Sequence, residues 1–375
     1  MNIVIAPDSF KGSLSALDAG TAMKEGVLTE IPNANISVIP MADGGEGTLE
    51  TLVYATKGKR IQVEATGPLG ERIETEYGIL GDGKTVVIET ANIAGLPMVA
   101  VKDRNPMDTT TFGLGEVILK AIEDGFQSFI IGLGGSATND GGVGMLQALG
   151  ATFLDENGTT LKPIGSSLAK VKTVDFTTLN SRLKDCHFKI ASDVDNPLCG
   201  PRGASYVFAP QKGATEKQVD ELDRALLNYA TIIEQTEQKQ LQNVTGAGAA
   251  GGLGFAFLLL GGEIISGSEI VANATKLTEK IEEADWVFTG EGQSDYQTLY
   301  GKAPSYIAKI AKKSKKRSIL ISGSLGVGYE QLYEYFLSCH SITTGPMTLD
   351  ECMQNAKQLL FHKTRDVSRL LKEMD

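Results

Sequence analysis

The chain has 375 residues, of which 42% are hydrophobic and 22% charged, a composition typical of a globular protein and unlike that of a collagen, a disordered chain or a membrane protein. Its formal net charge of −11 argues against a large nucleic-acid-binding surface. Because a single domain usually has about 100–200 residues, we expect two domains. The 43 glycines are about 11% of the chain, against a usual share of about 7%, and they gather in clusters. Such clusters indicate loops whose backbone closely approaches a ligand or another segment.

The chain start, the apolar segments and the cysteines indicate the cellular context. The first residues, MNIVIAPDSFKGS, lack a basic region before an apolar stretch, which predicts a first strand and no signal peptide. The most apolar stretch, 253–265, is interrupted by glycines and Glu263 and is too short to span a bilayer. Four cysteines without a CxxC pair are typical of free thiols in a reducing cytoplasm, and three scattered histidines disfavour zinc. We expect a cytoplasmic protein with no membrane or nucleic-acid partner.

Strand and helix signals alternate over the first sixty residues. NIVIA at 2–6 is a β-branched run that ends in a Pro-Asp-Ser loop. Ser15 and Asp18 fit a capping box, which predicts a helix that ends before Pro32. NISVI at 35–39 predicts a second strand, and the loop MADGGEGT opens a second helix. This order is typical of a parallel α/β sheet.

The pattern changes after residue 60 and returns near residue 285. Alternating apolar runs joined by Gly-Pro and Gly-Asp-Gly turns predict an antiparallel meander, and SFIIGL predicts a buried strand. A capping box at 215–218 predicts the start of a long helix. The later elements expected are strands DWVFT, SILIS and HSITT and helices at 303–313, 329–337 and from Leu349 to Met374. The sequence predicts one α/β domain built from both chain ends, with a middle domain inserted.

Six stretches combine glycine with carboxylate, amide or lysine side chains, and each is expected to follow a strand. In open α/β sheets, ligands bind beyond the carboxyl ends of the strands, where such loops converge. The stretches are APDSFKGS (6–13), MADGGEGT (41–48), GLGGSATNDGGVG (132–144), ASDVDNPLCGPRGA (191–204), GAGAAGGLG (246–254) and TGEGQSDYQTLYGKAP (289–304).

The stretch 132–144 is the most informative of the six. Its glycines let successive N–H groups line one surface, and the helix start that follows adds partial positive charge, which predicts a cradle for phosphate or carboxylate. The alternative is a tight strand-to-helix turn that needs positive φ. The candidate anion contacts in it are Gly134, Gly135, Ser136, Ala137, Thr138, Asn139 and Asp140.

Two further stretches carry carboxylates. Asp193 and Asp195 follow the predicted strand FKIAS and point to the same side if the segment is extended. Such a pair can hold Mg²⁺, or one acid can act as base while the other binds the metal; the alternative is ordinary turn chemistry before a proline. The stretch 289–304 supplies Glu291 and Asp295, and its Lys302 stands at a helix start.

Basic candidates stand at glycine loops. Lys302 is well placed for a phosphate oxygen, and Lys11, Arg202 and Lys212 are weaker candidates, since most such side chains are simply solvated. The stretch 246–254 fits either close helix packing or another phosphate-facing loop. No serine stands in GxSxG, which disfavours acyl transfer. Glycine cradles, acids and a few lysines instead indicate phosphoryl transfer.

Taken together, these motifs resemble the glycerate kinase type-1 family, bacterial enzymes that phosphorylate glycerate from ATP. The matching segments are APDSFKGSLSA, ADGGEGT, GLGGSATNDGG, ASDVDNPLCGP, PQKGA, GAGAAGGLG and GEG-x-x-D-x-Q-T-x-x-GKAP, in family order from residue 6 to residue 304. The resemblance implies a Rossmann-like domain formed by 1–62 and 285–375, a second mixed α/β domain at 63–284, and an active site in the cleft between them.

The resemblance also implies Mg-ATP-dependent phosphorylation of D-glycerate, at the 2-hydroxyl, to give 2-phosphoglycerate. From residue type we expect Asp193 to accept the hydroxyl proton and Lys11 and Lys302 to neutralise charge. Mg²⁺ is expected at Asp195, Glu291 and Asp295. The expected substrate or phosphate contacts also include Asp8, Ser9, Arg202 and Lys212.

The sequence leaves alternatives open. Many relatives carry a basic residue at position 293 and serine at 296, where this chain has Gln293 and Tyr296, so one phosphate contact of the family is in doubt. The alternative functions are a kinase for another small hydroxy acid and a non-catalytic sensor of phosphorylated metabolites. The expected assembly is a monomer or a small homo-oligomer.

Overall fold

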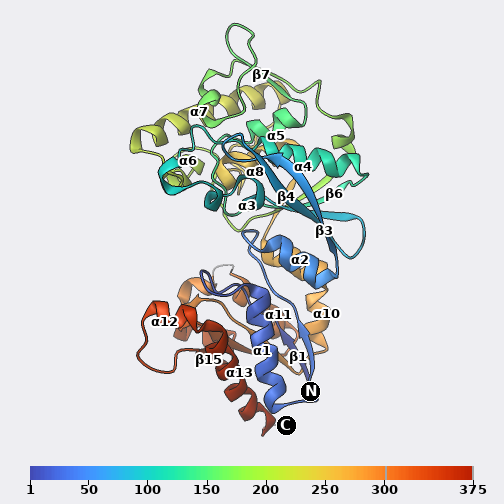
Figure 1. The fold of residues 1–375 in the computed structure, drawn as a ribbon, viewed down its shortest axis with the longest axis vertical. Coiled ribbons are helices and arrows are strands. Elements are labelled where there is room, and N and C mark those ends of the chain that lie inside the picture. Colours follow the sequence, from blue (N-terminus) through green and yellow to red (C-terminus); the bar gives the residue numbers. More distant parts are fainter. Residues whose placement is uncertain (300–301, 374–375) are drawn as a thin grey trace. The chain divides into compact units, whose positions relative to one another are not determined.

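The chain forms two α/β units, each built around its own sheet (Figure 1). The computed structural model describes residues 1–299 and 302–373. Unit 1 contains Met1–Asp43, Glu50–Thr56 and the chain from Ser268 onward. Unit 2 contains Gly44–Leu49 and Lys57–Gly267.

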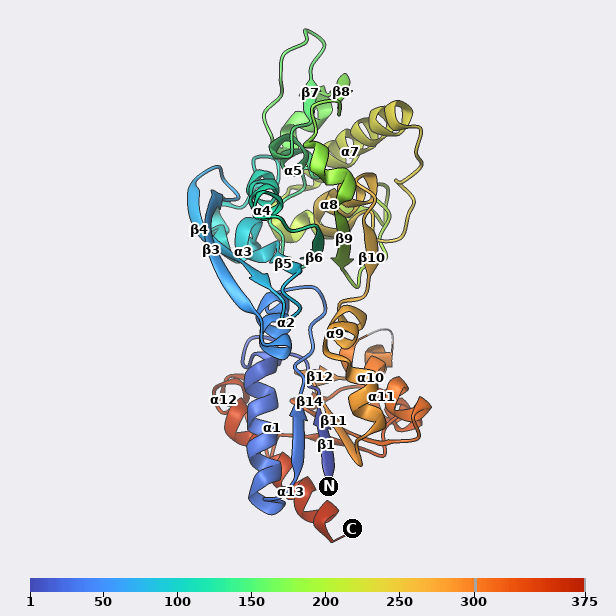
Figure 2. The ribbon, with the colours of Figure 1, turned by 90° about the vertical axis from the view of Figure 1, so that its right-hand side faces the viewer.

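Unit 1 has a five-stranded parallel sheet. Its strands, in spatial order, are β15 (Ser338–Ser341), β13 (Arg317–Ser322), β11 (Trp286–Thr289), β1 (Asn2–Ile5) and β2 (Asn35–Val38). Figure 2 shows α1 (Ala16–Glu30) and α13 (Ala356–Lys372) on one side of this sheet, and α10 (Leu277–Glu282) and α11 (Ala303–Lys313) on the other. Trp286 of β11 is 2% exposed and lies in the core of this unit.

The local signals of unit 1 are mostly confirmed. The Ser15 side chain accepts the N–H of Asp18 at the start of α1, as the capping box predicts. The predicted helix at 329–337 is shorter than expected: it is a 3-10 turn, Tyr329–Glu334, that buries Leu332.

The predicted final helix is two helices. α12 (Leu349–Gln354) ends at Asn355, and α13 follows. α12 buries none of its residues, and Leu349, the expected first member of the stripe, is 73% exposed. Of these two helices, only α13 packs into the core of unit 1. Met374, the last residue of that stripe, lies outside the described residues.

Unit 2 has a six-stranded mixed sheet. β3 (Lys59–Thr66), β4 (Arg72–Ile79) and β5 (Thr85–Glu89) form the predicted antiparallel meander. β5, β6 (Ser128–Gly132), β9 (His187–Ala191) and β10 (Glu263–Ile265) then run parallel. A separate antiparallel pair joins β7 (Thr152–Leu154) to β8 (Thr173–Asp175).

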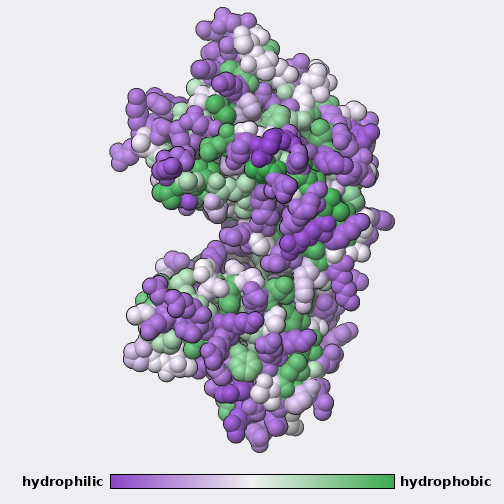
Figure 3. Space-filling view, viewed as in Figure 1, coloured by the Kyte–Doolittle hydropathy of each residue, from purple (hydrophilic) through white to green (hydrophobic). Residues whose placement is uncertain are grey.

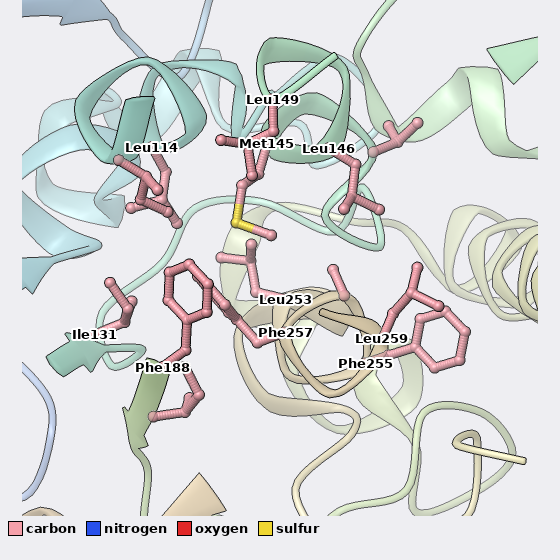
Figure 4. Packing of buried hydrophobic residues seen from close by; sticks show 14 of the residues in the cluster. Leu114, Ile131, Met145, Leu146, Leu149, Phe188, Leu253, Phe255, Phe257 and Leu259 are labelled. Atoms are coloured by element: carbon pink, nitrogen blue, oxygen red, sulfur yellow. The ribbon is translucent and has the colours of Figure 1, made fainter. Parts of the chain in front are cut away.

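Helices and strands of unit 2 share one apolar core (Figure 4). Leu114, Met145 and Leu253 come from three of its helices and meet Ile131 and Phe188 of the sheet. The capping box at Thr215 and Gln218 is present at the start of α7. The helices of unit 2 are α3 (Ala91–Ala94), α4 (Phe112–Glu123), α5 (Val143–Ala148), α6 (Ala204–Phe208), α7 (Glu216–Glu237) and α8 (Ala249–Leu259). Two helices, α2 (Thr48–Thr56) and α9 (Gly267–Thr275), begin in unit 2 and lie mostly in unit 1.

Both units confirm the predicted fold class. One is a parallel-sheet unit formed by both chain ends, and the other is a mixed α/β unit inserted between them. The face in Figure 3 is mainly hydrophilic, with apolar side chains in small groups. Within 1–299 and 302–373, no helix has the length and apolar character needed to span a bilayer. All four cysteines are free thiols.

Candidate functional site

The strand order of unit 1 creates a switch point between β1 and β11. From β1 the chain proceeds to β2 on one side, whereas β11 leads to β13 and β15 on the other. Ligands of open α/β sheets bind beyond the carboxyl ends of strands at such a point. Two of the predicted loops, 6–13 and 289–304, follow these two strands, and the N–H of Asp8 donates to the Gly290 carbonyl at 2.8 Å.

Five charged residues of unit 1 form what we call the lysine–carboxylate cluster: Asp8, Lys11, Asp43, Glu291 and Lys302. The Lys11 ammonium lies 3.4 Å from an Asp43 carboxylate oxygen, and the Lys302 ammonium lies 3.1 Å from Glu291. The Lys11 side chain is 81% exposed and that of Lys302 40% exposed. The cluster therefore offers two ammonium groups to an anionic ligand.

The electrostatics of the cluster fit this arrangement. Burial, together with the neighbouring Asp43 and Glu291 carboxylates, raises the pKa of Asp8 to about 7. The Asp43 carboxylate raises the pKa of Lys11, so Lys11 stays charged. Ser9, predicted as a phosphate contact, donates its backbone N–H to Asp8 at 2.7 Å.

Replacing Asp8 with asparagine is expected to stabilise the protein in a pH-dependent way. Because its pKa rises from about 3.9 in an unfolded chain to about 7, the native state binds more protons between these values and stability falls as pH rises through them. Asp8→Asn removes that loss of stability. We therefore expect the free energy of unfolding to rise by on the order of 2 kcal/mol at pH 8, and by less as pH falls toward 4. Urea unfolding at pH 4.5, 6 and 8 measures this change in stability. The exposed Asp366→Asn is the control. A stabilisation by Asp8→Asn that does not vary with pH would contradict the raised pKa of Asp8.

The predicted Mg²⁺ ligands are distributed over both units. Glu291 and Asp295 lie in unit 1 and share the Thr298 hydroxyl, which donates to Glu291 at 2.7 Å and accepts the N–H of Asp295 at 3.2 Å. Asp195 lies in unit 2, where its carboxylate pairs with Arg202 at 3.1 Å and both side chains are exposed. Tyr300 and Gly301 of the same motif lie outside the described residues.

Among the residues that the structure describes, no three His, Cys, Asp or Glu side chains gather as a metal site. Mg²⁺ in kinases is usually held by one or two carboxylates together with substrate phosphates and water. The residues present fit that kind of site, and they do not form an all-protein cage.

The glycine loop of unit 2 differs from the predicted anion cradle. The N–H groups of Gly134, Ala137 and Gly141 donate to the carbonyls of Gly44, Ala94 and Gly251, at 2.8–2.9 Å. The prediction is corrected for these donors, because they bond to protein carbonyls. A Cβ on Gly134 would lie 2.3 Å from the Gly45 Cα, so this glycine is needed for close backbone packing. Gly135 (φ +74°) is exposed at the turn.

Asp140 is an internal brace of this loop and is fully buried. Its carboxylate accepts the N–H and hydroxyl of Thr111 at 2.9 and 2.7 Å, and the N–H groups of Gly142 and Gly144 at 3.1 and 3.3 Å. It thus joins the start of α4 to the start of α5. The prediction that Asp140 contacts phosphate is therefore corrected, since its oxygens are already used inside the unit.

Removing the charge of this brace is expected to be costly. Asp140→Asn turns one accepting oxygen into a donor that faces other donors, which we expect to lower the free energy of unfolding by about 2–4 kcal/mol. Urea unfolding followed by circular dichroism measures the change. Asp185→Asn, on an exposed turn of the same unit, is the control and should change stability by less than about 0.5 kcal/mol. Equal stability of the two variants would contradict this structural role of Asp140.

Lys212 is buried at 3% exposure, and its ammonium faces the inside of the same loop. It donates to the Ser136 hydroxyl at 2.9 Å and to the Thr138 carbonyl at 2.6 Å. Burial lowers the pKa of Lys212 to about 7. The prediction of Lys212 as a phosphate contact is corrected, because the amine is shielded from solvent and bonded to the loop. Thr138 and Asn139 are fully buried as well.

Asp193 is exposed on the loop after β9. One of its carboxylate oxygens accepts the N–H of Gly267 at 3.1 Å, at the start of α9. Asp195, its expected partner, pairs with Arg202, and the Arg202 carbonyl accepts the amide of Asn196 at 2.8 Å. Asp193 and Asp195 are therefore both exposed on this segment, and Asp195 forms the ion pair with Arg202.

Two further carboxylates of the candidate site, Asp43 and Glu89, are not among the residues that the sequence predicts. Asp43 stands in MADGGEGT, so the motif was found, but only the fold brings this acid to Lys11. Glu89, 2% exposed, accepts the N–H groups of Gly47 and Leu49 at 3.1 Å and so fixes the same loop. A carboxylate at the end of the apolar strand KTVVIET was the available signal.

Comparisons with known proteins show the family of the chain. A family model described as "Glycerate kinase family" matches residues 3–372. The chain is 46% identical to a protein named glycerate kinase from Halalkalibacterium halodurans, over 98% of this chain and 97% of the relative. It is 45% identical to a protein named glycerate 2-kinase from Escherichia coli K12, over 99% of this chain and 98% of the relative.

A solved structure is similar over the whole chain. It is a crystal structure assigned as glycerate kinase 2 from Salmonella typhimurium LT2, with a TM-score of 0.89 and 43% sequence identity, and the match covers 100% of this chain and 98% of that one. The chain therefore belongs to the glycerate kinase family and is a kinase that phosphorylates an alcohol group, which confirms the resemblance seen in its motifs.

Proposed function

We propose that the protein transfers the γ-phosphoryl group of Mg-ATP to the 2-hydroxyl of D-glycerate and releases 2-phosphoglycerate and ADP. The observation that carries the proposal is the lysine–carboxylate cluster at the switch point of unit 1, in a chain that matches the glycerate kinase family from residue 3 to 372. The name glycerate 2-kinase of the Escherichia coli relative supports the 2-position. The expected location is the cytoplasm.

In this proposal unit 1 handles the phosphates. Lys302 and Lys11 offset the charge that develops on the transferred group, which is the main contribution a protein makes to phosphoryl transfer. When bound, Mg²⁺ neutralises phosphate oxygens and aligns them. Of the three predicted ligands we retain Asp295, because Asp195 pairs with Arg202 and the Glu291 oxygens accept hydrogen bonds from three side chains.

Asp193 is the proposed base. The substrate hydroxyl oxygen forms a bond to the γ-phosphorus as the bond to the bridging oxygen of ADP breaks, and the hydroxyl proton passes to the Asp193 carboxylate. Asp193 is exposed, and the loop that carries it is held at Gly267. An acid with these properties can be reached by a small substrate.

A substrate panel at fixed Mg-ATP tests the proposal. ADP release is measured with D-glycerate, L-glycerate, tartronate, D-lactate and no acceptor. We expect D-glycerate to give the highest kcat/KM. A higher kcat/KM for another acid would make that acid the preferred substrate. Saturable binding of phosphorylated acids without ADP release would indicate a sensor and not an enzyme.

A further inference from the structure

Glu291 lies two residues after the end of β11, and its side chain is 8% exposed. Its Oε1 accepts the hydroxyls of Ser294 at 2.9 Å and Thr298 at 2.7 Å. Its Oε2 accepts the Lys302 ammonium at 3.1 Å. Both carboxylate oxygens are therefore engaged by the protein itself.

The two hydroxyls that hold Oε1 are themselves fixed. Ser294 and Thr298 are fully buried, and the Ser294 hydroxyl lies 2.7 Å from the hydroxyl of Ser322, the last residue of β13. Thr298 also accepts the N–H of Asp295. Glu291 is thus held by the loop that follows β11 and, through Ser294, by the last residue of β13, while its Oε2 faces Lys302.

Lys302 stands where an anion would be expected. It is the N-cap residue of α11, with a proline in the first turn, and a helix start favours negative charge. Its side chain is 40% exposed, whereas its partner Glu291 is almost covered. An ammonium group has three donors, so the bond to Glu291 orients Lys302 and leaves donors for a ligand.

We propose that Glu291 is a positioning residue that holds the Lys302 ammonium for a phosphate oxygen of the nucleotide, and that it does not bind Mg²⁺. The inference rests on the proposed function, because it needs a nucleotide at this site. A metal ion on Oε2 would displace the ammonium and place two cations side by side, which is electrostatically unfavourable. A metal ion on Oε1 would displace two buried hydroxyls.

Nucleotide binding measured without metal separates positioning from metal binding. The dissociation constant of ATP is measured by calorimetry in EDTA, and the Mg²⁺ concentration for half-maximal turnover is measured separately. We expect Glu291→Gln and Lys302→Met each to weaken metal-free ATP binding by about tenfold. The double variant should be within about twofold of Lys302→Met, because both changes remove one interaction. The Mg²⁺ requirement of Glu291→Gln should stay within about twofold of the parent protein.

Two further sets of variants keep the test decisive. Glu334→Gln breaks a different Glu–Lys pair of unit 1, with Lys312, and should leave ATP binding unchanged. Thr298→Val and Ser294→Ala each loosen Glu291 without removing it and should weaken metal-free ATP binding by about threefold. If Glu291→Gln does not fold, these two variants decide the question alone.

Three results would overturn the inference. The first is unchanged metal-free ATP binding of Glu291→Gln with a tenfold higher Mg²⁺ requirement, which would make Glu291 a metal ligand. The second is a double variant whose effect is the product of the two single effects. The third is unchanged ATP binding of Thr298→Val and Ser294→Ala. If the parent protein neither binds ATP nor releases ADP, the proposed function itself fails; if it does both, only the role of Glu291 is at stake.

Discussion

Lys302→Met is expected to lower kcat/KM for ATP by about 10²–10³-fold. The variant removes a cation that would act on the transferred phosphoryl group while keeping most of the side-chain length. Because the loss of Lys302 leaves the nearly buried Glu291 carboxylate without its cation, the free energy of unfolding should fall by about 1–3 kcal/mol. Steady-state kinetics at saturating D-glycerate measures the effect.

Lys313→Met is the matched control for this prediction. Lys313 lies on the same helix as Lys302, near its other end, and is exposed. Its replacement should leave kcat/KM within about twofold of the parent value. Similar losses in the two variants would show that general positive charge on α11, and not the position of Lys302, attracts the nucleotide.

Asp193→Asn is expected to lower kcat by about 10²–10⁴-fold, the usual range for a general base, with a smaller change in KM for D-glycerate. Asparagine keeps the acceptor oxygen that meets the N–H of Gly267, so the loop should keep its conformation. The melting temperature of the variant should match that of the parent protein.

An exposed aspartate elsewhere in unit 2 provides the control for Asp193. Asp220 lies on α7, where it accepts the hydroxyl of Tyr206. Asp220→Asn should be fully active. A folded Asp193→Asn variant with parental turnover would remove Asp193 from the reaction and direct attention to the carboxylates of unit 1.

Local signals predicted the fold well because each depends on residues close in sequence. The capping box at Thr215 forms both expected hydrogen bonds, and Ser15 accepts the expected N–H of Asp18. The parallel strands lie on β-branched apolar runs, which can be predicted as buried strands from their own residues. The exception at 349–355 has a similar explanation, since periodicity indicates an apolar stripe but does not say which part of it meets a core.

The site was predicted less completely because its contacts join distant residues. Glycines at 132–144 indicated free N–H donors, but those of Gly134 and Gly141 bond to Gly44 and Gly251, about one hundred residues away in either direction. Lys212 likewise reaches Ser136 across 76 positions. No local pattern distinguishes a donor that meets a ligand from one that meets another loop.

The position of the acids and lysines of unit 1, in contrast, was predicted from the sequence. APDSFKGS and the stretch 289–304 combine charged residues and glycines with a place after strands, and the strand order brings both to the switch point. What the sequence did not show is how Glu291 is used. The two hydroxyls that saturate it come from the same loop, yet their direction depends on the turn that the loop makes.

Product identity tests the central claim most directly. Purified protein is incubated with Mg-ATP and D-glycerate in the presence of enolase alone, and phosphoenolpyruvate is followed by its absorbance while ADP is measured in parallel. We predict equimolar ADP and phosphoenolpyruvate without added phosphoglycerate mutase, because enolase accepts 2-phosphoglycerate directly. ADP without phosphoenolpyruvate would contradict phosphorylation at the 2-hydroxyl, and no ADP from the folded protein would contradict the kinase assignment for this substrate.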